Sequence, residues 1–516
     1  MNMKDRIKKL RETKQKAKDG IPEKIEKQRN RGKMTARDRI DALLDPDSFV
    51  EVNPLVASQC AEFGMADNRR HGDGLVGGFG TIGGKKVCVY AQDFTYLGGS
   101  IGAAHGRKMC EIVDVARKRG VPIVGMFDSA GARIQEGWGG GRDGGSLFLP
   151  NTLASGVVPQ IALILGPCAG ISVYSPALMD FVIMVDGISY MHITGPKVIE
   201  SVTGETFTSE QLGGAQVHCA GTGCAHLRTV SENECFQMVQ KILSYLPANH
   251  LEDPPVAGSV DDPERTDDEL ENIVPSDPRK SYDVKDVIGR VADFGDFFEI
   301  HPEFAPNIVV GFARLTGRTI GVVANQPMVM GGALTVDASD KCARFVRFCD
   351  CFNIPLVYFA DVPGYLPGID AEHAGIIRHG AKMLYAYCEA SVPKITMVLR
   401  KGYGGGILAM GGNKGLGADL ILAWPTAEIA VVGAEAAVDL LLKKEINNSE
   451  NPEAARNKKI EWYRETFGDP IHGAETGTVD DVIEPRDTRR ILIKHIEFLR
   501  GKRESRPRKK HGNIPL

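Results

Sequence analysis

Short apolar runs alternate with longer segments of helical periodicity along most of this chain. Runs such as Val87–Ala91, Ile123–Phe127 and Ile161–Leu165 are rich in β-branched residues and have the length of buried strands. Between them, the segment GAAHGRKMCEIVDVARKRG that follows Gly99 places its apolar residues at helical spacing and ends at Gly120. Strand, turn and helix in series are typical of an α/β fold with a largely parallel sheet.

The pattern occurs twice. VPIVGMFDSAGARIQEG aligns with IPLVYFADVPGYLPG, and the segment VPQIALILGPCAGISVYSP from Val158 aligns with VPKITMVLRKGYGGGILAM from Val392. The glycine pair that begins at Gly98 aligns with the pair at Gly331 (331 − 98 = 233), and the other blocks keep an offset of 233 or 234. Chance similarities would not share one offset, so two copies of one domain are predicted.

The repeat sets the expected domain boundaries. We expect a charged helical segment over 1–45, an N-terminal domain over 30–250, a Pro-rich acidic linker over 251–288 and a C-terminal domain over 289–516. In the second copy DASDKCARFVRFCDCFN is the counterpart helix, with Asp337 or Ser339 as its N-cap. The terminal stretch RGKRESRPRKKHG is expected to be a solvated basic tail.

Composition narrows the class of protein. The 516 residues are 43% hydrophobic and 25% charged with a formal net charge of −4, the profile of a soluble globular protein with no global basic field for nucleic acid. No apolar run has the length of a membrane span, and the first residues lack the apolar centre of a signal peptide. The eleven cysteines form no framework, so a reduced, cytoplasmic protein is expected.

Glycine-rich turns follow corresponding apolar runs in both copies and are the candidate functional sites. Gly170 and Ile171 occupy this turn in the first copy, and residues 404–406 occupy it in the second. A strand that ends in glycines and leads into a helix presents free backbone N–H groups, which bind negative charge or stabilise an oxyanion such as an enolate. Two such turns suit a reaction between two carbonyl-like partners. From these residues alone, tight turns without a function are an equal interpretation.

Other motifs give no comparable site. The patterns GDGLVG and GFGTIG precede a strand or lie in a hairpin, so no dinucleotide site is expected, and no Walker sequence occurs. In HCAGTGCAH the spacing of His218, Cys219, Cys224 and His226 is not a standard ligand pattern, so no metal is expected. Ser129 lacks the G-x-S-x-G context of a nucleophile, and no acidic pair stands out as an acid–base couple.

Longer strings resemble a known family. These strings are GDGLVGGFGTIGG, QDFTYLGGSIGAAHGRK, DSAGARIQEG, GPCAGISVYSPALMD, NQPMVMGGALTVDASDKCARFVRFCD, NIPLVYFADVPGYLPG and VPKITMVLRKGYGGG, and the resemblance runs from about residue 30 to the end. They resemble the carboxyltransferase (beta) subunits of biotin-dependent acyl-CoA carboxylases and decarboxylases, of the propionyl-CoA and methylmalonyl-CoA kind. This resemblance implies two crotonase-like domains and a homohexamer built as a trimer of dimers. Acyl-CoA would be held mainly by the N-terminal domain of one subunit, and biotin would enter from the C-terminal domain of its partner.

The resemblance also implies a mechanism. Carboxybiotin on a separate carrier gives up CO2, the freed ureido nitrogen takes the α-proton of the acyl-CoA, and the enolate attacks CO2. The amides of Gly170 and Ile171 would hold the thioester enolate, and those of Gly405 and Gly406 would hold the ureido oxygen. Substrate contacts are then expected at Gly98, Gly99, Ala130, Gly131, Ala132, Tyr174 and Leu408, and biotin contacts at Gly331, Gly332, Tyr365, Tyr403 and Gly404.

The sequence leaves the partner proteins and the direction of carboxyl transfer open. The chain has no biotin-attachment Met-Lys-Met and no ATP-binding motif, so a biotin carboxyl carrier protein and a biotin carboxylase subunit are expected as partners. A sodium-pumping decarboxylase would instead pair with a membrane subunit.

Three features depart from the family pattern. Ile171 stands where the family has glycine, and its branched side chain would reshape the acyl pocket or compromise the first oxyanion hole. A catalytically altered scaffold homologue is therefore an alternative. Leu408 stands where propionyl-CoA carboxylases commonly have an acidic residue. The glycine-rich stretch 138–145 is expected to be a flexible loop, with or without a role as a lid.

Overall fold

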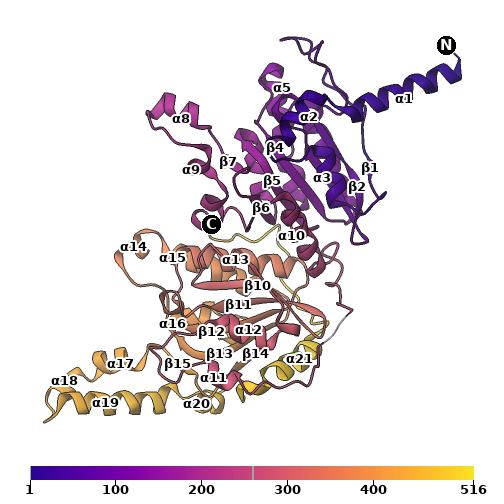
Figure 1. The fold of residues 1–516 in the computed structure, drawn as a ribbon. Helices are drawn as coiled ribbons and strands as arrows, with labels where there is room; N and C mark the ends of the chain where they lie inside the picture. Colours follow the sequence, from indigo (N-terminus) through magenta and orange to yellow (C-terminus); the bar gives the residue numbers. More distant parts are fainter. Residues whose placement is uncertain (1, 259–260) are drawn as a thin grey trace. The chain divides into compact units, whose positions relative to one another are not determined.

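The computed structural model describes residues 2–258 and 261–516, and the chain divides into two compact units between Glu252 and Asp253. Each unit contains one eight-stranded sheet with helices packed against it (Figure 1). We call them the first unit and the second unit.

The sheet of the first unit runs in the order β1-β2-β3-β4-β5-β6-β8, with β7 beside β5. The pairs β1–β2 and β2–β3 are antiparallel, and the remaining pairs are parallel. Its strands are β1 (Val50–Glu51), β2 (Leu75–Ile82), β3 (Lys85–Gln92), β4 (Ile123–Ser129), β5 (Gln160–Ala169), β6 (Phe181–Val185), β7 (Tyr190–His192) and β8 (Leu227–Thr229).

The sheet of the second unit repeats this topology as β9-β10-β11-β12-β13-β14-β16, with β15 beside β13. The register irregularity between Phe127 and Ser129 on β4 recurs between Ala360 and Val362 on β12. The predicted α/β fold with one domain present twice is therefore confirmed. The strands are β9 (Phe297–Ile300), β10 (Ile308–Leu315), β11 (Arg318–Asn325), β12 (Leu356–Val362), β13 (Lys394–Tyr403), β14 (Leu420–Ala423), β15 (Glu428–Ala430) and β16 (Asp481–Val482).

The helices that carry the later argument occur largely as counterparts. In the first unit they are α4 (Ala103–Arg119), α5 (Trp138–Gly145), α7 (Tyr174–Leu178), α8 (Pro196–Thr203) and α10 (Glu232–Tyr245). In the second they are α13 (Val336–Cys351), α14 (Ile369–His373), α15 (Ile376–Glu389), α16 (Gly404–Ala409), α17 (Ala434–Leu441) and α21 (Thr488–Leu499). None of the helices in the described parts of the chain is long and apolar enough to cross a membrane.

The cap of α13 differs from the prediction. Thr335 is the N-cap, and its side chain accepts a hydrogen bond from the Ala338 amide at 3.1 Å. Asp337 and Ser339 lie inside the helix, where the Ser339 hydroxyl donates to the Thr335 carbonyl at 2.8 Å. The cap falls on Thr335 because it has the extended backbone that an N-cap needs.

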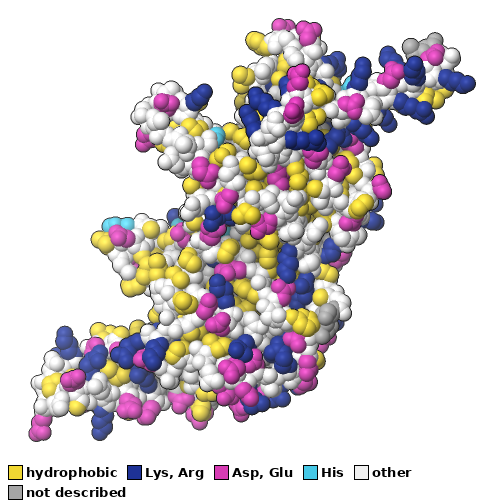
Figure 2. Space-filling view, in the orientation of Figure 1, with side chains coloured by type: hydrophobic (Ala, Val, Ile, Leu, Met, Phe, Trp, Pro, Cys, Tyr) yellow, Lys and Arg dark blue, Asp and Glu magenta, His cyan; other side chains and the backbone are white. Residues whose placement is uncertain are grey.

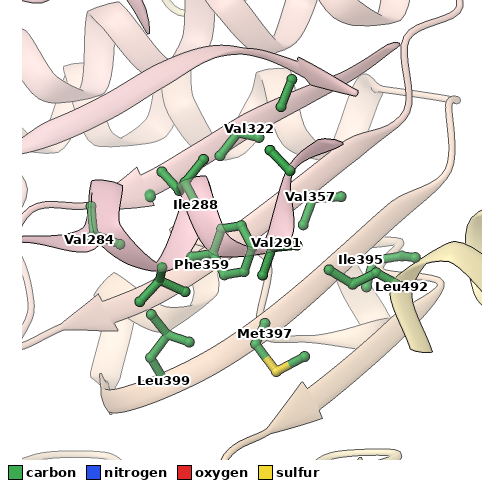
Figure 3. Close-up of a cluster of buried hydrophobic side chains, with 14 of the residues drawn as sticks. Val284, Ile288, Val291, Val322, Val357, Phe359, Ile395, Met397, Leu399 and Leu492 are labelled. Carbon is green, nitrogen blue, oxygen red and sulfur yellow. The ribbon is translucent and has the colours of Figure 1, made fainter. Parts of the chain in front are cut away.

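The core of the second unit draws on residues expected to form a linker. Val284 and Ile288 of α12 (Val284–Val291) pack with Phe359 of β12, and Leu492 of α21 lies beside Ile395 of β13 (Figure 3). The same cluster includes the buried side chains of Leu270, Val274 and Tyr282.

The two ends of the chain differ in their contacts: α1 is almost entirely exposed, whereas the C-terminal tail contacts the second unit. The charged N-terminus forms α1 (Met3–Asp19), α2 (Pro22–Arg29) and α3 (Ala36–Leu43). The basic tail has no helix or strand and is largely exposed, as expected, but it is anchored: the Arg506 guanidinium donates to the carbonyls of Cys388 at 3.2 Å and Ala390 at 2.9 Å. These carbonyls lie at the C-terminal end of α15, where helix acceptors lack intrahelical donors, so the tail caps this helix.

Candidate functional site: two glycine turns

The first glycine turn connects β5 to α7 through a single helical turn, η3 (Gly170–Val173). Gly170 has φ = 58°, a conformation that residues with a side chain seldom adopt. A Cβ atom at Gly131, at the end of β4, would lie 2.8 Å from the Ala169 carbonyl oxygen, so the two strand ends approach closely. The first backbone amides of a helical turn have no acceptor within that turn. Gly170 and Ile171 therefore present N–H groups at the end of β5.

The predicted substrate residues of the first unit converge on this turn. The Ala130 amide donates to the Gly98 carbonyl at 2.9 Å, and Ile101 donates to Gly131 at 2.8 Å while it bridges to Ala132. A Cβ at Gly99 would lie 2.0 Å from the Asp128 carbonyl oxygen, which explains the glycine. Tyr174 begins α7, is 44% exposed and packs edge-on against Phe148.

The second glycine turn is the counterpart at the end of β13. Gly404 has φ = 53° and begins α16, and a Cβ there would lie 2.8 Å from the Val431 carbonyl oxygen. Gly405 is exposed, and a Cβ there would meet nothing closer than the Tyr365 ring at 3.9 Å. A Cβ at Gly406 would lie 2.8 Å from the Cα atom of Gly364. Gly405 therefore leaves the start of α16 open to approach from outside the helix, whereas Gly406 is buried.

The other residues predicted on the biotin side surround this second turn. Gly331 and Gly332 lie in η6 (Met330–Gly332), where a Cβ at Gly332 would be 2.7 Å from the Asp361 carbonyl oxygen. The Tyr365 hydroxyl is buried without a hydrogen-bond partner, and burial raises its pKa. The Tyr403 ring lies 3.1 Å from where a Cβ of Gly433 would be. Leu408 lies on α16 of the second unit, whereas the other predicted substrate residues belong to the first.

A buried carboxylate supports the first turn, and the sequence analysis missed it. Asp128 lies on β4, two residues before Ala130, and is fully buried. It accepts hydrogen bonds from Lys33 at 2.8 Å and Arg39 at 2.9 Å, and its own amide donates to the Gln92 side chain at 3.1 Å. Arg39 continues to Glu232 at 2.7 Å. This network holds the end of β4 in place.

The second unit has the equivalent carboxylate. Asp361 on β12 accepts from Arg400 at 3.0 Å and from the Lys401 amide at 3.0 Å, and its own amide donates to Asn325 at 3.2 Å. The offset of 233 relates Asp361 to Asp128 and Asn325 to Gln92. The Asp in FDSAG and ADVPG was therefore the signal that could have revealed both networks.

The buried or bonded Cys and His side chains named below, all in the first unit, are not poised for acid–base or nucleophilic work. Burial raises the pKa of Cys168 to about 12, and its thiol donates to the Ser172 carbonyl at 3.3 Å. Burial lowers the pKa of His105 to about 3. His218 contacts the Met191 carbonyl at 2.8 Å and His226 accepts from the Val182 amide at 3.0 Å. Within residues 2–258 and 261–516, no cluster of three or more His, Cys, Asp or Glu side chains could hold a metal ion.

The glycine-rich stretch expected to be a loop is a helix, α5. It packs closely on α4, because a Cβ at Gly106 would lie 2.6 Å from the carbonyl carbon of Asp143. The Asp143 carboxylate also pairs with Arg107 at 2.7 Å. The Ile171 side chain points towards α5: its Cδ1 atom is 3.5 Å from where a Cβ of Gly145 would be. The small residues of α5 leave the space that the branched side chain occupies.

Comparison with known proteins defines the class of this chain. Residues 27–514 match the family described as the carboxyl transferase domain. The chain is 52% identical to the propionyl-CoA carboxylase carboxyltransferase subunit of Haloferax mediterranei, with 100% of both chains covered. It is 50% identical to the methylmalonyl-CoA decarboxylase subunit alpha of Veillonella parvula, with 99% of both covered. The chain therefore belongs to the carboxyl transferase family.

A solved structure agrees with this assignment over the whole chain. The transcarboxylase 12S crystal structure, a hexamer assembly with methylmalonyl-coenzyme A and methylmalonic acid bound, matches with a TM-score of 0.97 and 49% identity. The match covers 100% of this chain and 99% of that one. The crotonase-like fold that the sequence strings implied is thereby confirmed.

Proposed function

We propose that this chain transfers a carboxyl group between carboxybiotin on a separate carrier protein and the α-carbon of a propionyl-CoA or methylmalonyl-CoA type of acyl-CoA. The observation that carries the proposal is the pair of equivalent glycine turns, Gly170 at φ = 58° and Gly404 at φ = 53°, each at the start of a helical turn that directly follows a strand. Carboxyl transfer through an enolate develops negative charge on a thioester oxygen, which fixed amide donors stabilise.

The first turn is the proposed enolate site. The amides of Gly170 and Ile171 would donate to the thioester oxygen as charge develops on it. The buried Asp128 network keeps the end of β4 rigid, so these donors need not reorganise during the reaction. Since Cys168 and His105 are not poised for proton transfer, the side chains named here supply no base.

The second turn fits the ureido group of biotin. That group offers a small oxygen acceptor, and the exposed start of α16 offers donors with no side chain at Gly405 to block the approach. Gly405 and Gly406 would hold the oxygen, with Tyr365, Tyr403, Gly331 and Gly332 around it. When bound, biotin supplies the carboxyl group and a nitrogen base. The acyl-CoA is then the substrate, and the carrier is the macromolecular partner.

The same arrangement serves carboxylation and decarboxylation, because a catalyst that stabilises one transition state lowers the barrier in both directions. Direction would be set by the partner subunits, a biotin carboxylase in one case and a membrane subunit in the other. A homohexamer is proposed because the transcarboxylase 12S structure, which this fold matches throughout, is a hexamer assembly.

The test is carboxyl transfer from methylmalonyl-CoA or malonyl-CoA to free biotin by the purified chain, compared with Gly405→Pro. Proline removes the amide donor, yet position 405 lies in the first turn of α16, where proline is tolerated. We expect kcat to fall by about 10²–10³-fold, the loss typical of one oxyanion-hole donor.

Gly405→Ala is the matched control. It keeps the amide, and its Cβ meets only ordinary contact at 3.9 Å, so activity should stay near that of the parent chain. Equal activity in Gly405→Pro and Gly405→Ala would remove the second turn from the mechanism. No biotin-dependent transfer with any acyl-CoA, from an intact oligomer, would argue for the scaffold alternative.

A further inference from the structure

A cavity of about 540 Å³ lies in the second unit, at the edge of the sheet opposite the glycine turn. It opens beside Pro355 and Pro393, which directly precede β12 and β13, and beside the residues that follow α21. β13 has ten residues, and at about 3.3 Å per residue it separates this cavity from Gly404 by roughly 30 Å. The carboxyl-transfer proposal makes no use of this end of the sheet.

The cavity wall is rich in basic side chains. Arg318, Arg500, Lys502 and Arg503 line it, against the two carboxylates of Asp253 and Glu497. Glu497 lies 3.4 Å from both Arg318 and Arg500, and these two guanidinium groups are 33% and 52% exposed. Lys502 is held in place by Asp419 at 2.8 Å and Glu504 at 2.7 Å. Partly exposed guanidinium groups keep donors available to a ligand.

The first unit shows that the fold does not require this cavity. Lys85 is the counterpart of Arg318 at the offset of 233, and its ammonium donates to the carbonyls of Leu243 and Leu246 at the end of α10. The chain after α10 then covers the strand ends: Asn249 donates to the Gly120 carbonyl at 3.0 Å and the His250 amide to Val157 at 3.1 Å.

Asn353 and Ser391, which correspond to Gly120 and Val157 of the first unit, line the cavity of the second unit. After α21 the chain turns at Gly501, with φ = 79°, and passes through Lys502 and Arg503. The basic tail therefore borders an open cavity, whereas the chain after α10 covers the corresponding strand ends in the first unit.

We infer that this cavity is a binding site for a small phosphate-bearing molecule. Guanidinium groups match phosphate oxygens through paired hydrogen bonds, and three arginines line this cavity. The volume is within the range of about 300–1,000 Å³ of small-molecule sites. The inference does not depend on the proposed carboxyl-transfer function.

Isothermal titration calorimetry of the full chain with inorganic pyrophosphate tests the inference. Saturating coenzyme A is present, so that any phosphate-binding surface used by the acyl-CoA is already occupied. We expect one saturable site per chain. The double variant Arg500→Gln, Arg503→Gln should weaken binding at least tenfold, and Arg508→Gln, a charge loss in the same tail outside the cavity lining, should not.

Three results would overturn the site. They are an absence of saturable pyrophosphate binding in titrations with and without coenzyme A, binding that the double variant leaves unchanged, and binding that is seen without coenzyme A and lost when it is added. Citrate binding in place of pyrophosphate would overturn the assignment to phosphate chemistry. Biotin-dependent carboxyl transfer by the double variant, measured without pyrophosphate, should equal that of the parent chain. The activity measurement therefore distinguishes an error in the proposed cavity site from an error in the proposed function.

Discussion

Arg39 joins three segments of the first unit through one guanidinium group. It is fully buried and bonds to Asp128 at 2.9 Å, to Glu232 at 2.7 Å and to the Leu165 carbonyl at 2.7 Å. Its counterpart in function, Arg400, does the same for Asp361 in the second unit. These buried charged groups need all of their partners together, because burial of any one charge without a partner costs free energy.

Removal of Arg39 should therefore destabilise the first unit strongly. Arg39→Met leaves two buried carboxylates short of a partner, and we expect a loss of about 3–5 kcal/mol in the free energy of unfolding. Arg456→Met, which breaks an exposed pair with Asp439, should change the free energy of unfolding far less, because solvent screens exposed ion pairs. Urea unfolding at one protein concentration measures both. Equal shifts of the two midpoints would contradict the structural role of the network.

Substitutions at Ile171 distinguish the role of its backbone amide from that of its side chain. Ile171→Ala keeps the amide and frees space against α5, so we expect near-parental kcat with methylmalonyl-CoA and a gain of about tenfold in relative kcat/KM for a bulkier acyl-CoA. Ile171→Pro removes the donor and should lower kcat by about 10²–10³-fold with every substrate. If the alanine variant loses as much as the proline variant, the amide is not the functional group.

At the scale of elements, α15 is held at its C-terminal end by charges that come from elsewhere in the second unit. Glu389 pairs with Arg347 and with Lys509 of the tail, while Arg506 caps the last carbonyls. Burial acts to raise the pKa of Glu389, but the hydrogen bonds from Lys509 and Arg347 outweigh it and lower the pKa from 4.5 to about 2.

This shift predicts a pH-dependent attachment of the tail. Because the pKa of Glu389 is lower in the folded chain, its contribution is complete above pH 4.5 and is lost as the pH falls towards 2. The difference in unfolding stability between the parent chain and Glu389→Gln should shrink over that interval. Proteolysis of the tail in both proteins at pH 6 and near pH 3 gives a second measure. A difference that stays constant with pH would contradict the assignment.

At the scale of the whole molecule, each unit leaves apolar helices uncovered. In the second unit, hydrophobic side chains gather over the segment that carries α14 and the start of α15, where Ile369 and Ile377 are 70% and 77% exposed (Figure 2). Leu440 and Leu441 of α17 and Val198 and Val202 of α8 are exposed at corresponding places in the two copies. Surfaces of this kind are typical of contacts between subunits.

Ile377→Asp should therefore weaken the proposed homohexamer. A charge in a desolvated contact is costly, so we expect smaller species in light scattering coupled to size-exclusion chromatography. Val230→Asp, at an apolar position of the first unit that is 80% exposed, is the control and should leave the mass unchanged. A parent chain that is monomeric at micromolar concentration would contradict the proposal.

The sequence alone determined the features that depend on local pattern and on the repeat. Strand and helix periodicity predicted the α/β layers, and the constant offset predicted two copies, because both record which faces of each element are buried. The glycines at 98, 99, 131, 170 and 404 were also readable, since close approach or a positive φ leaves little choice of residue there. The family strings then supplied the chemistry that these turns could perform.

Only the tertiary structure decided the features that rest on distant partners. Asp128 and Arg39 are ordinary surface residue types until the fold brings them together with Glu232 in a dry interior. A glycine-rich stretch reads as a loop, yet α5 is stabilised because its small residues allow close packing on α4. The basic tail likewise reads as solvated until α15 offers it carbonyls and a carboxylate. Local propensity is weak beside such contacts, which form only between segments far apart in the chain.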